Sequence, residues 1–189
     1  EELDGEVVKK SLIVKIADGT RKCDSKEEVD SDEAYLVAID DVKESGPAWQ
    51  ARHELSAAAY QKTFDDMAKQ GFRLTWISGH EINGEDRYSA IWEKSPGPSW
   101  QARHGLNAVQ YQKAFDDLTK LGYRLVQVSG YSNHGEARYA AIFDKSAGPA
   151  WLARHGMTSG QYQQEFNDLT KQGYRLVDVS GYSSGGQAR

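Results

Sequence analysis

The stretch Gly97-Pro98-Ser99-Trp100-Gln101-Ala102-Arg103-His104 occurs three times in this chain of 189 residues, with only small changes between copies. The other two copies stand 51 residues before it and 51 residues after it. Self-similarity at a fixed period of a few tens of residues is the signature of a repeat architecture. We therefore expect three units that together form one domain, with the boundaries 46–96, 97–147 and 148–189.

A predicted amphipathic helix follows the repeated motif in each unit. In the second unit Tyr111, Phe115 and Leu118 recur at i, i+4 and i+7, which predicts one apolar helix face. Ser, Asn or Thr precedes each helix as an N-cap, and a glycine follows it at the position where a left-handed residue ends a helix. These signals predict helices over about 56–70, 107–121 and 158–172.

Two strands are expected after each helix. In the second unit the segments 123–131 and 138–143 are rich in β-forming residues, and the turn Asn133-His134-Gly135 lies between them. Two such segments joined by a short Asn/Gly turn predict an antiparallel hairpin. A hairpin cannot bury both of its faces alone, so its helix and the adjoining units must cover it. The predicted fold class is α+β, with one helix and one hairpin in each unit.

The first 45 residues differ from the rest in charge and supply a predicted closing strand. They carry 14 acidic and 7 basic residues, whereas residues 46–189 carry 14 and 16. The segment 33–39 aligns with 136–142, while the third unit reaches only the position of Arg138. We expect a strand over 33–40 to pair beside 174–181 and close the three units into a ring or a compact domain, which removes an exposed sheet edge. In the alternative, the strand completes the last unit of another molecule and gives head-to-tail self-association by strand exchange.

The most conspicuous polar groups are the three copies of Trp-x-Ala-Arg-His. In a structural interpretation the tryptophan is a buried wedge between units, the arginine pairs with an acid such as Asp66, Asp117 or Asp168, and the histidine donates to backbone at a turn. In a binding interpretation tryptophan, arginine and histidine form three small pockets. Trp76, which is replaced by Gln127 and Asp178 in the other units, is expected to point outward as a contact residue. The candidate binding residues are Trp49, Arg52, His53, Trp76, Trp100, Arg103, His104, Trp151, Arg154 and His155.

Several functional classes find no support in the sequence. A catalytic centre needs one asymmetric constellation, which three equivalent copies do not suit, so we expect no catalytic residues and no cofactor. The lone Cys23 excludes a disulfide framework and a multi-cysteine zinc site, and we expect no metal. The repeat region is nearly neutral, which argues against a nucleic-acid partner. No apolar run approaches the roughly 18–20 residues of a membrane span.

The repeated string resembles a known family. Gly-Pro-Ala/Ser-Trp-x-Ala-Arg-His, followed by Gly-Tyr-Arg-Leu-x-x-Val-Ser-Gly-Tyr-Ser, resembles the bacterial tandem repeat, the structural repeat of the polyglycine hydrolase N-terminal domain, over about 33–189. The resemblance implies a repeat domain that occurs alone or joined to enzymes, often a β-lactamase-like serine peptidase that carries the catalysis. The first unit departs from the string at Glu54, Phe72 and His80.

These observations lead to one expected function and two alternatives. We expect a non-catalytic interaction or scaffold module that binds an unknown protein or glycan ligand or associates with itself. The first alternative is the accessory targeting fragment of a secreted serine peptidase of that kind. The second is a small carbohydrate-binding protein. An extracellular location is the corresponding expectation.

Overall fold

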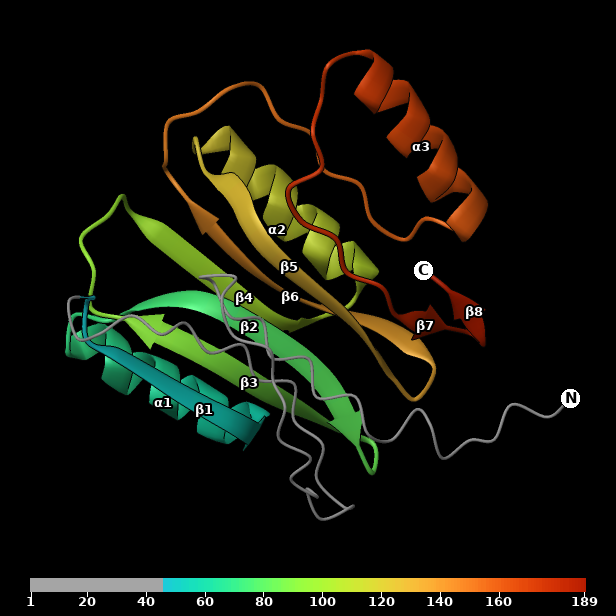
Figure 1. Cartoon of the computed structure of the whole chain (residues 1–189). Helices are drawn as coiled ribbons and strands as arrows, with labels where there is room; N and C mark the ends of the chain where they lie inside the picture. The colour runs from blue at the N-terminus through green and yellow to red at the C-terminus, as the bar shows by residue number, and fades with distance from the viewer. Residues whose placement is uncertain (1–45) are drawn as a thin grey trace, which may run out of the picture. The chain divides into compact units, whose positions relative to one another are not determined.

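The computed structural model describes residues 46–189, of which 47–189 form one compact unit. The predicted closing strand at 33–40, the acidic segment 1–45 as a whole and Cys23 lie outside the described residues. The compact unit consists of the three repeats, which are shown in Figure 1.

The first two repeats have the same order of elements. Repeat 1 contains β1 (Trp49–Ser56), α1 (Ala57–Lys69), β2 (Arg73–Ile82) and β3 (Glu85–Glu93). Repeat 2 contains β4 (Trp100–Leu106), α2 (Ala108–Lys120), β5 (Arg124–Asn133) and β6 (Glu136–Asp144). Each forms a three-stranded antiparallel sheet in the order β1-β3-β2 or β4-β6-β5, so that the second hairpin strand lies in the middle. Repeat 3 contains α3 (Ser159–Lys171), β7 (Ser183–Ser184) and β8 (Gln187–Ala188).

The predicted helices are confirmed, and their ends have the predicted chemistry. Asn107 caps α2 and forms a reciprocal capping box with Gln110, in which each side chain accepts from the other residue's backbone N–H. At the other end Gly122 has a φ of 81°, and the next N–H, that of Tyr123, donates to the carbonyl of Leu118 at 3.0 Å. This is a Schellman motif, which needs a left-handed residue and therefore favours glycine.

The predicted hairpins are also confirmed. Asn83 and Gly84 join β2 to β3, and His134 and Gly135 join β5 to β6. All four residues have positive φ, as a type I′ turn requires. This turn matches the right-handed twist of the two flanking strands and so fixes their register.

One strand in each of the first two repeats was not predicted. The sequence indicated that the Trp-x-Ala-Arg-His segment leads directly into the helix, whereas it forms β1 and β4 and pairs with the middle strand of each sheet. A bulge interrupts β1 between Arg52 and Leu55, and Glu54 there has a φ of 54°. The corresponding residue in β4 is Gly105, which adopts the same left-handed conformation without the penalty of a Cβ.

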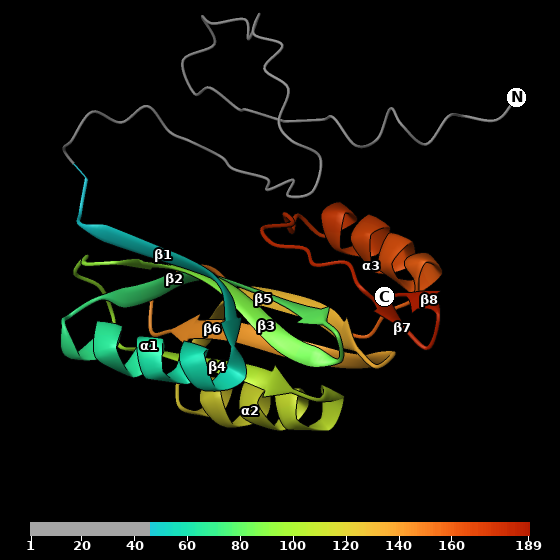
Figure 2. The same cartoon turned by 90° about the horizontal axis from the view of Figure 1, so that it is seen from below.

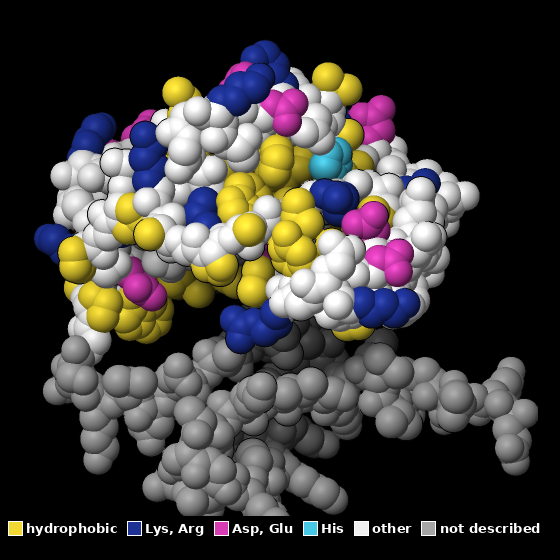
Figure 3. Space-filling model, turned by 90° about the horizontal axis from the view of Figure 1, so that it is seen from above, with side chains coloured by type: hydrophobic (Ala, Val, Ile, Leu, Met, Phe, Trp, Pro, Cys, Tyr) yellow, Lys and Arg dark blue, Asp and Glu magenta, His cyan; other side chains and the backbone are white. Residues whose placement is uncertain are grey.

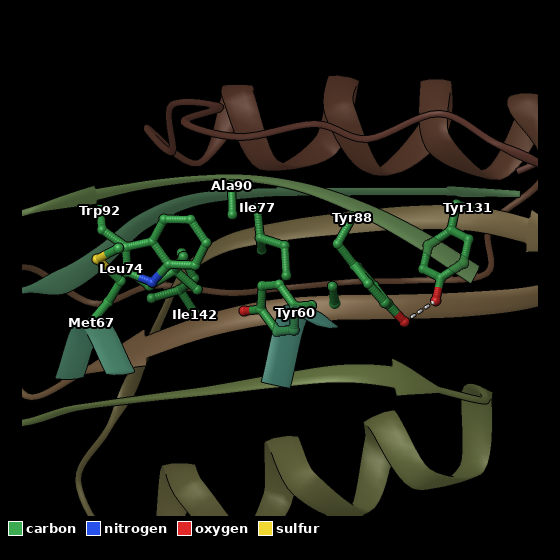
Figure 4. Packing of buried hydrophobic residues seen from close by; sticks show 10 residues of the cluster. Tyr60, Met67, Leu74, Ile77, Tyr88, Ala90, Trp92, Tyr131 and Ile142 are labelled. Atoms are coloured by element: carbon green, nitrogen blue, oxygen red, sulfur yellow. Dashed lines mark hydrogen bonds between the residues drawn. The ribbon is translucent and has the colours of Figure 1, made fainter. Parts of the chain in front are cut away.

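Repeat 2 lies between its neighbours, and its sheet is covered on both faces. Figures 1 and 2 show repeats 1 and 3 on either side of it, with α1 and α2 on the same side of the strands. On β6, Ala140 and Ile142 belong to the core shared with repeat 1, while Tyr139, Ala141 and Phe143 pack with the repeat's own helix. In repeat 1 Trp92 is fully buried, and Figure 4 shows its ring among the side chains of this core.

Candidate functional site at the repeat interfaces

The tryptophan and the histidine of the repeated motif contact the preceding repeat. The Trp100 ring lies edge-on to Phe64 of α1, with ring centres 5.4 Å apart. The His104 ring lies 4.7 Å from that of Tyr60 and 5.1 Å from that of Tyr88. The second interface repeats these contacts, with Trp151 against Phe115 and His155 against Tyr111 and Tyr139. Both motif positions therefore join one repeat to the one before it.

The three tryptophans differ in burial because only two of them have a preceding repeat among the described residues. Trp100 and Trp151 are half-buried at the two interfaces, close to the predicted wedge. Trp49, in repeat 1, has 66% of its surface exposed. The indole is therefore covered to the extent that a neighbouring unit is present.

The arginines of the motif are not grouped with the tryptophan and the histidine. Trp100 and Ala102 pack on the core shared with repeat 1, so strand alternation directs Arg103 to the other face of β4. There its Nη2 donates to Gln101 Oε1 at 2.6 Å. Arg154 pairs with an acid, as the structural interpretation predicted, but its partner is Glu165 at 3.3 Å rather than Asp168. Arg52 donates to the carbonyl of its own neighbour, Ala51.

The histidines also differ from the structural interpretation of the sequence. His104 lies in β4, with its ring against two tyrosines, rather than at a turn with its ring nitrogen on backbone. His155 shares a hydrogen bond of 2.8 Å between its Nε2 and Gln112 Oε1. Burial lowers the pKa of both imidazoles, and for His104 the nearby Asp86 carboxylate opposes part of this effect. Both rings are therefore stabilised in their neutral form.

A second set of contacts, which sequence reasoning missed, covers the free edge of each sheet. β2 is an edge strand of its sheet, and polar side chains of β5 hydrogen-bond to its backbone. Gln127 accepts from the N–H of Ile77 at 3.3 Å and donates to the carbonyl of Ile77 at 3.0 Å. Ser129 Oγ accepts from the N–H of Gly79 at 3.0 Å. Backbone groups that would otherwise need a further strand are satisfied by side chains of the next repeat.

The same edge contacts occur between repeats 2 and 3. Asp178 Oδ2 accepts from the N–H of Val128 at 2.9 Å, and Ser180 Oγ accepts from the N–H of Gly130 at 2.9 Å. In both interfaces the partners stand 50 residues apart in the sequence. The contact is therefore a property of the repeat rather than of one pair of units.

Trp76 and its counterparts show what the sequence prediction got right and wrong. Trp76 is 51% exposed, which confirms that it points outward. Gln127 occupies the same place in repeat 2, but only 5% of its surface is exposed. The signal that could have identified it is an amide in the middle of an otherwise apolar strand, because a buried amide must have hydrogen-bond partners.

An aromatic ring lies over a glycine at each interface. The Tyr131 ring lies directly over Gly79, and the Tyr182 ring lies over Gly130, so neither glycine has room for a Cβ. The Tyr131 hydroxyl is 2.8 Å from that of Tyr88, as Figure 4 shows. Tyr139 and Tyr182 form the equivalent pair of hydroxyls at the second interface.

The first interface also holds a half-buried carboxylate, Asp86, that the second lacks. Asp86 accepts from the hydroxyl of Tyr131 at 2.9 Å and from the side-chain amide of Asn133 at 2.5 Å. Ala137 stands at the matching position in repeat 2. Burial, together with the nearby Tyr88 and Asp86, raises the pKa of Tyr131 far above its ordinary value. The hydroxyls of Tyr88 and Tyr131 and the carboxylate of Asp86 bond to one another, and this cluster stabilises the contact between the repeats.

Arginines that follow the helices anchor the linkers between repeats. Arg73 Nη1 donates to the carbonyl of Pro98 at 2.5 Å, and Arg124 Nη1 donates to that of Pro149 at 2.7 Å. The guanidinium of Arg124 also lies 5.8 Å from the ring centre of Trp151. The Gly-Pro pair and this arginine recur together because they form one contact.

Other chemical features of the described region are few. Residues 46–189 contain no group of three or more His, Cys, Asp or Glu side chains arranged to hold a metal ion. None of the helices α1, α2 and α3, at 13 residues each, is long enough to span a membrane. A shallow hollow of about 580 Å³ lies over α2 and is lined by Val109, Gln112, Asp116, Lys120 and His155, among others. It includes one of the ten candidate residues named from the sequence.

The fold and the interfaces define an α+β repeat protein whose units are built on one another. The chain belongs to the polyglycine hydrolase-like structural repeat family, whose model matches residues 46–95, 97–146 and 148–189. This confirms the resemblance drawn from the repeated motif. A comparison with curated proteins gave no match.

Proposed function

We propose that this chain is a non-catalytic scaffold module that presents surfaces to a binding partner. The observation that carries the proposal is that the same motif positions make the same contacts at two interfaces. The motif tryptophan, the motif histidine and the strand serine make the same contacts at both interfaces. Their role is therefore to assemble the array. Binding is then left to the surfaces that this assembly does not use.

The exposed surface of repeat 1 is the part of the described region best suited to a partner. Trp49 and Trp76 are 66% and 51% exposed, and Ile91 on β3 is 38% exposed. Exposed aromatic residues supply large contact areas and are enriched at protein interfaces. A protein partner that covers these two indoles would gain the apolar burial that repeat 2 gains through Trp100.

Proximity labelling in the producing cell, with the labelling enzyme fused to the whole chain, tests the binding function. We expect a set of enriched proteins whose recovery falls at least tenfold in the double variant Trp49→Ser/Trp76→Ser. Val109→Ser is the matched control, because Val109 is 79% exposed on α2 and lies away from this surface. Equal recovery with all three chains would contradict the proposal.

The non-catalytic part of the proposal has its own test. The family description names polyglycine hydrolase, so a peptide with a polyglycine run is the appropriate substrate probe. We expect the chain to leave it intact. Cleavage that persists through purification and is lost in His104→Ala would overturn this part.

An accessory role beside a peptidase is a second candidate, because the family to which the repeats belong is named polyglycine hydrolase-like. In this role the repeats would hold an attached catalytic domain near its substrate. A Ser-x-x-Lys domain in the same reading frame would support the role. A reading frame that encodes only repeats would exclude it.

A further inference from the structure

The two ends of the row of repeats carry the two halves of the interface that joins the repeats internally. Repeat 1 presents the face with which repeats 2 and 3 contact their predecessors, and its indoles Trp49 and Trp76 are exposed there. Repeat 3 presents the face that repeats 1 and 2 offer to their successors. The described residues leave both faces uncovered in the same molecule, and Figures 1 and 2 show repeats 1 and 3 on opposite sides of repeat 2.

The face on repeat 3 has open positions where the earlier repeats are filled. Phe166 is 39% exposed, whereas its counterparts Phe64 and Phe115 are covered by Trp100 and Trp151. Val179 is 62% exposed, whereas its counterpart Ile77 is fully buried. Figure 3 views the molecule from above Figure 1, the side on which α2 and α3 lie, and shows apolar side chains gathered near the middle of the view.

Gly181 is the clearest open position. Its counterparts Gly79 and Gly130 each lie under a tyrosine ring of the next repeat, but a Cβ at Gly181 would meet nothing within 4 Å. An aromatic ring from a further unit would find here an uncovered glycine like the one that Tyr131 covers at Gly79. The first repeat carries an aromatic side chain, His80, at the position of Tyr131 and Tyr182.

We propose that repeat 1 of one molecule docks on repeat 3 of a second molecule, head to tail, through the contacts that join the repeats internally. The inference rests on the proposed scaffold function and names a second copy of this chain as the partner. The proposed contact continues an existing series, because the same motif positions form both internal interfaces and the end faces carry the matching positions. In this contact Trp49 covers Phe166 of the partner molecule, as Trp100 covers Phe64.

Polar partners complete the contact. Ser78 occupies the position of Ser129 and Ser180, so its Oγ accepts from the N–H of the second copy's Gly181. Arg175 occupies the position of Arg73 and Arg124, so its guanidinium donates to the carbonyl of the other molecule's Pro47. Each contact has two precedents 51 or 102 residues away in the same sequence.

Trp76 is the position of repeat 1 at which the proposed contact between molecules is weaker than the internal contact between repeats. Gln127 both accepts from and donates to the backbone of Ile77, whereas an indole N–H only donates. With Trp76 in this place, the N–H of Val179 in the second copy has no acceptor from this residue. Trp76→Gln restores the acceptor and is therefore expected to tighten the association.

Sedimentation velocity on the full 189-residue chain across a concentration series tests the proposal. We expect the mass to rise from the monomer value of 21.1 kDa through a dimer to longer head-to-tail species. Gly181→Leu fills the open position without entering a left-handed conformation and should weaken association at least tenfold. Gly160→Leu is the matched control, because Gly160 also has nothing within 4 Å and lies on α3. Thermal unfolding of both variants checks that they fold.

The outcomes separate this inference from the proposed function. A mass that stays at 21.1 kDa at every concentration would overturn the head-to-tail contact. Equal assembly by the two glycine variants, or weaker assembly by Trp76→Gln, would overturn it as well. If any of these results is obtained, enrichment of partner proteins by proximity labelling would still support the scaffold function. Absence of both self-association and enrichment would remove both proposals.

Discussion

Repeats 2 and 3 have closely similar sequences but very different cores. Their helices have the same length of 13 residues and the same capping box, so the local signals for a helix are equally strong. In α2, Tyr111 and Leu118 are buried, whereas α3 buries none of its residues. The difference lies in the neighbours, because β6 and a flanking repeat cover α2 and its sheet.

A unit of this kind therefore does not bury its own core without neighbours. Its helix forms from local capping and amphipathicity, but the apolar side chains become buried only against a middle strand and an adjoining repeat. Repeat proteins in general derive part of their stability from interfaces between nearest neighbours. Here those interfaces include hydrogen bonds from side chains to a sheet edge, which fix the register of one unit on the next.

The largest difference between the two repeats is expected for the matched leucines of their helices. Leu118 is 4% exposed in the second core cluster, and Leu118→Ala should cost about 2–5 kcal/mol of unfolding free energy. Leu169, its counterpart in α3, is half-buried, and Leu169→Ala should cost about 1 kcal/mol or less. Urea unfolding of both variants measures the two losses. Equal losses would show that repeat 3 is as well packed as repeat 2.

A smaller difference is expected for the side chains that cover the sheet edges. Gln127→Leu leaves both the N–H and the carbonyl of Ile77 without this partner, and should cost about 2–3 kcal/mol. Asp178→Leu removes one bond, to the half-buried N–H of Val128, and should cost about 1 kcal/mol. The measurement is the same unfolding experiment. A larger cost for Asp178→Leu would reverse our ranking of the two interfaces.

The left-handed glycines of the Trp-x-Ala-Arg-His-Gly segment provide a finer test. Gly105 and Gly156 have φ values of 64° and 67°, so alanine at either position should cost about 1–2 kcal/mol in backbone strain. A Cβ at Gly105 would also lie 3.2 Å from the Tyr88 hydroxyl, whereas one at Gly156 meets nothing within 4 Å. Thermal unfolding should therefore show the larger loss for Gly105→Ala. A larger loss for Gly156→Ala would mean that contacts of Tyr88 do not restrict this position.

The smallest expected effect is the pH dependence that the interface histidines contribute. Burial places the folded-state pKa of His104 and His155 below the value of about 6.5 in the unfolded chain. The unfolded chain then binds more protons, so this contribution is complete above about pH 7 and is lost as the pH falls through 6.5 toward the folded pKa. His104→Gln should reduce the loss of stability between pH 7.5 and 5.5. An unchanged pH profile would show that His104 does not titrate differently in the two states.

The sequence predicted the local structure well because its signals are local. The N-cap at Asn107, the glycine at 122 and the turn at His134-Gly135 each act within a few residues, and the structure confirms all three. β4 was missed because its segment is short, carries a glycine bulge and pairs with β6, which lies about 40 residues along the chain. No local pattern distinguishes such a segment from a loop before a helix.

The interface residues were hard to predict for the same reason. Gln127 is polar in an apolar strand, and a polar residue in that pattern ordinarily faces water. Its partner, the Ile77 backbone, lies 50 residues away in another repeat. In the repeated Trp-x-Ala-Arg-His motif the tryptophan was predicted to lie between units, but the contact of the histidine with tyrosines of the preceding repeat depends on how the repeats stack, which the sequence does not show directly.

Hydrogen exchange of the edge-strand amides tests the central claim most directly, that each repeat covers the sheet edge of the one before it. We predict that the amides of Ile77 and Gly79 are protected in the native chain and exchange at least tenfold faster in Gln127→Ala/Ser129→Ala. The amide of Ala90, in the middle strand of the same sheet, should exchange more slowly than either and change less. If the two edge amides exchange at the same rate in both proteins, the side chains of repeat 2 do not cover the edge of repeat 1, and the account of how the repeats are joined is wrong.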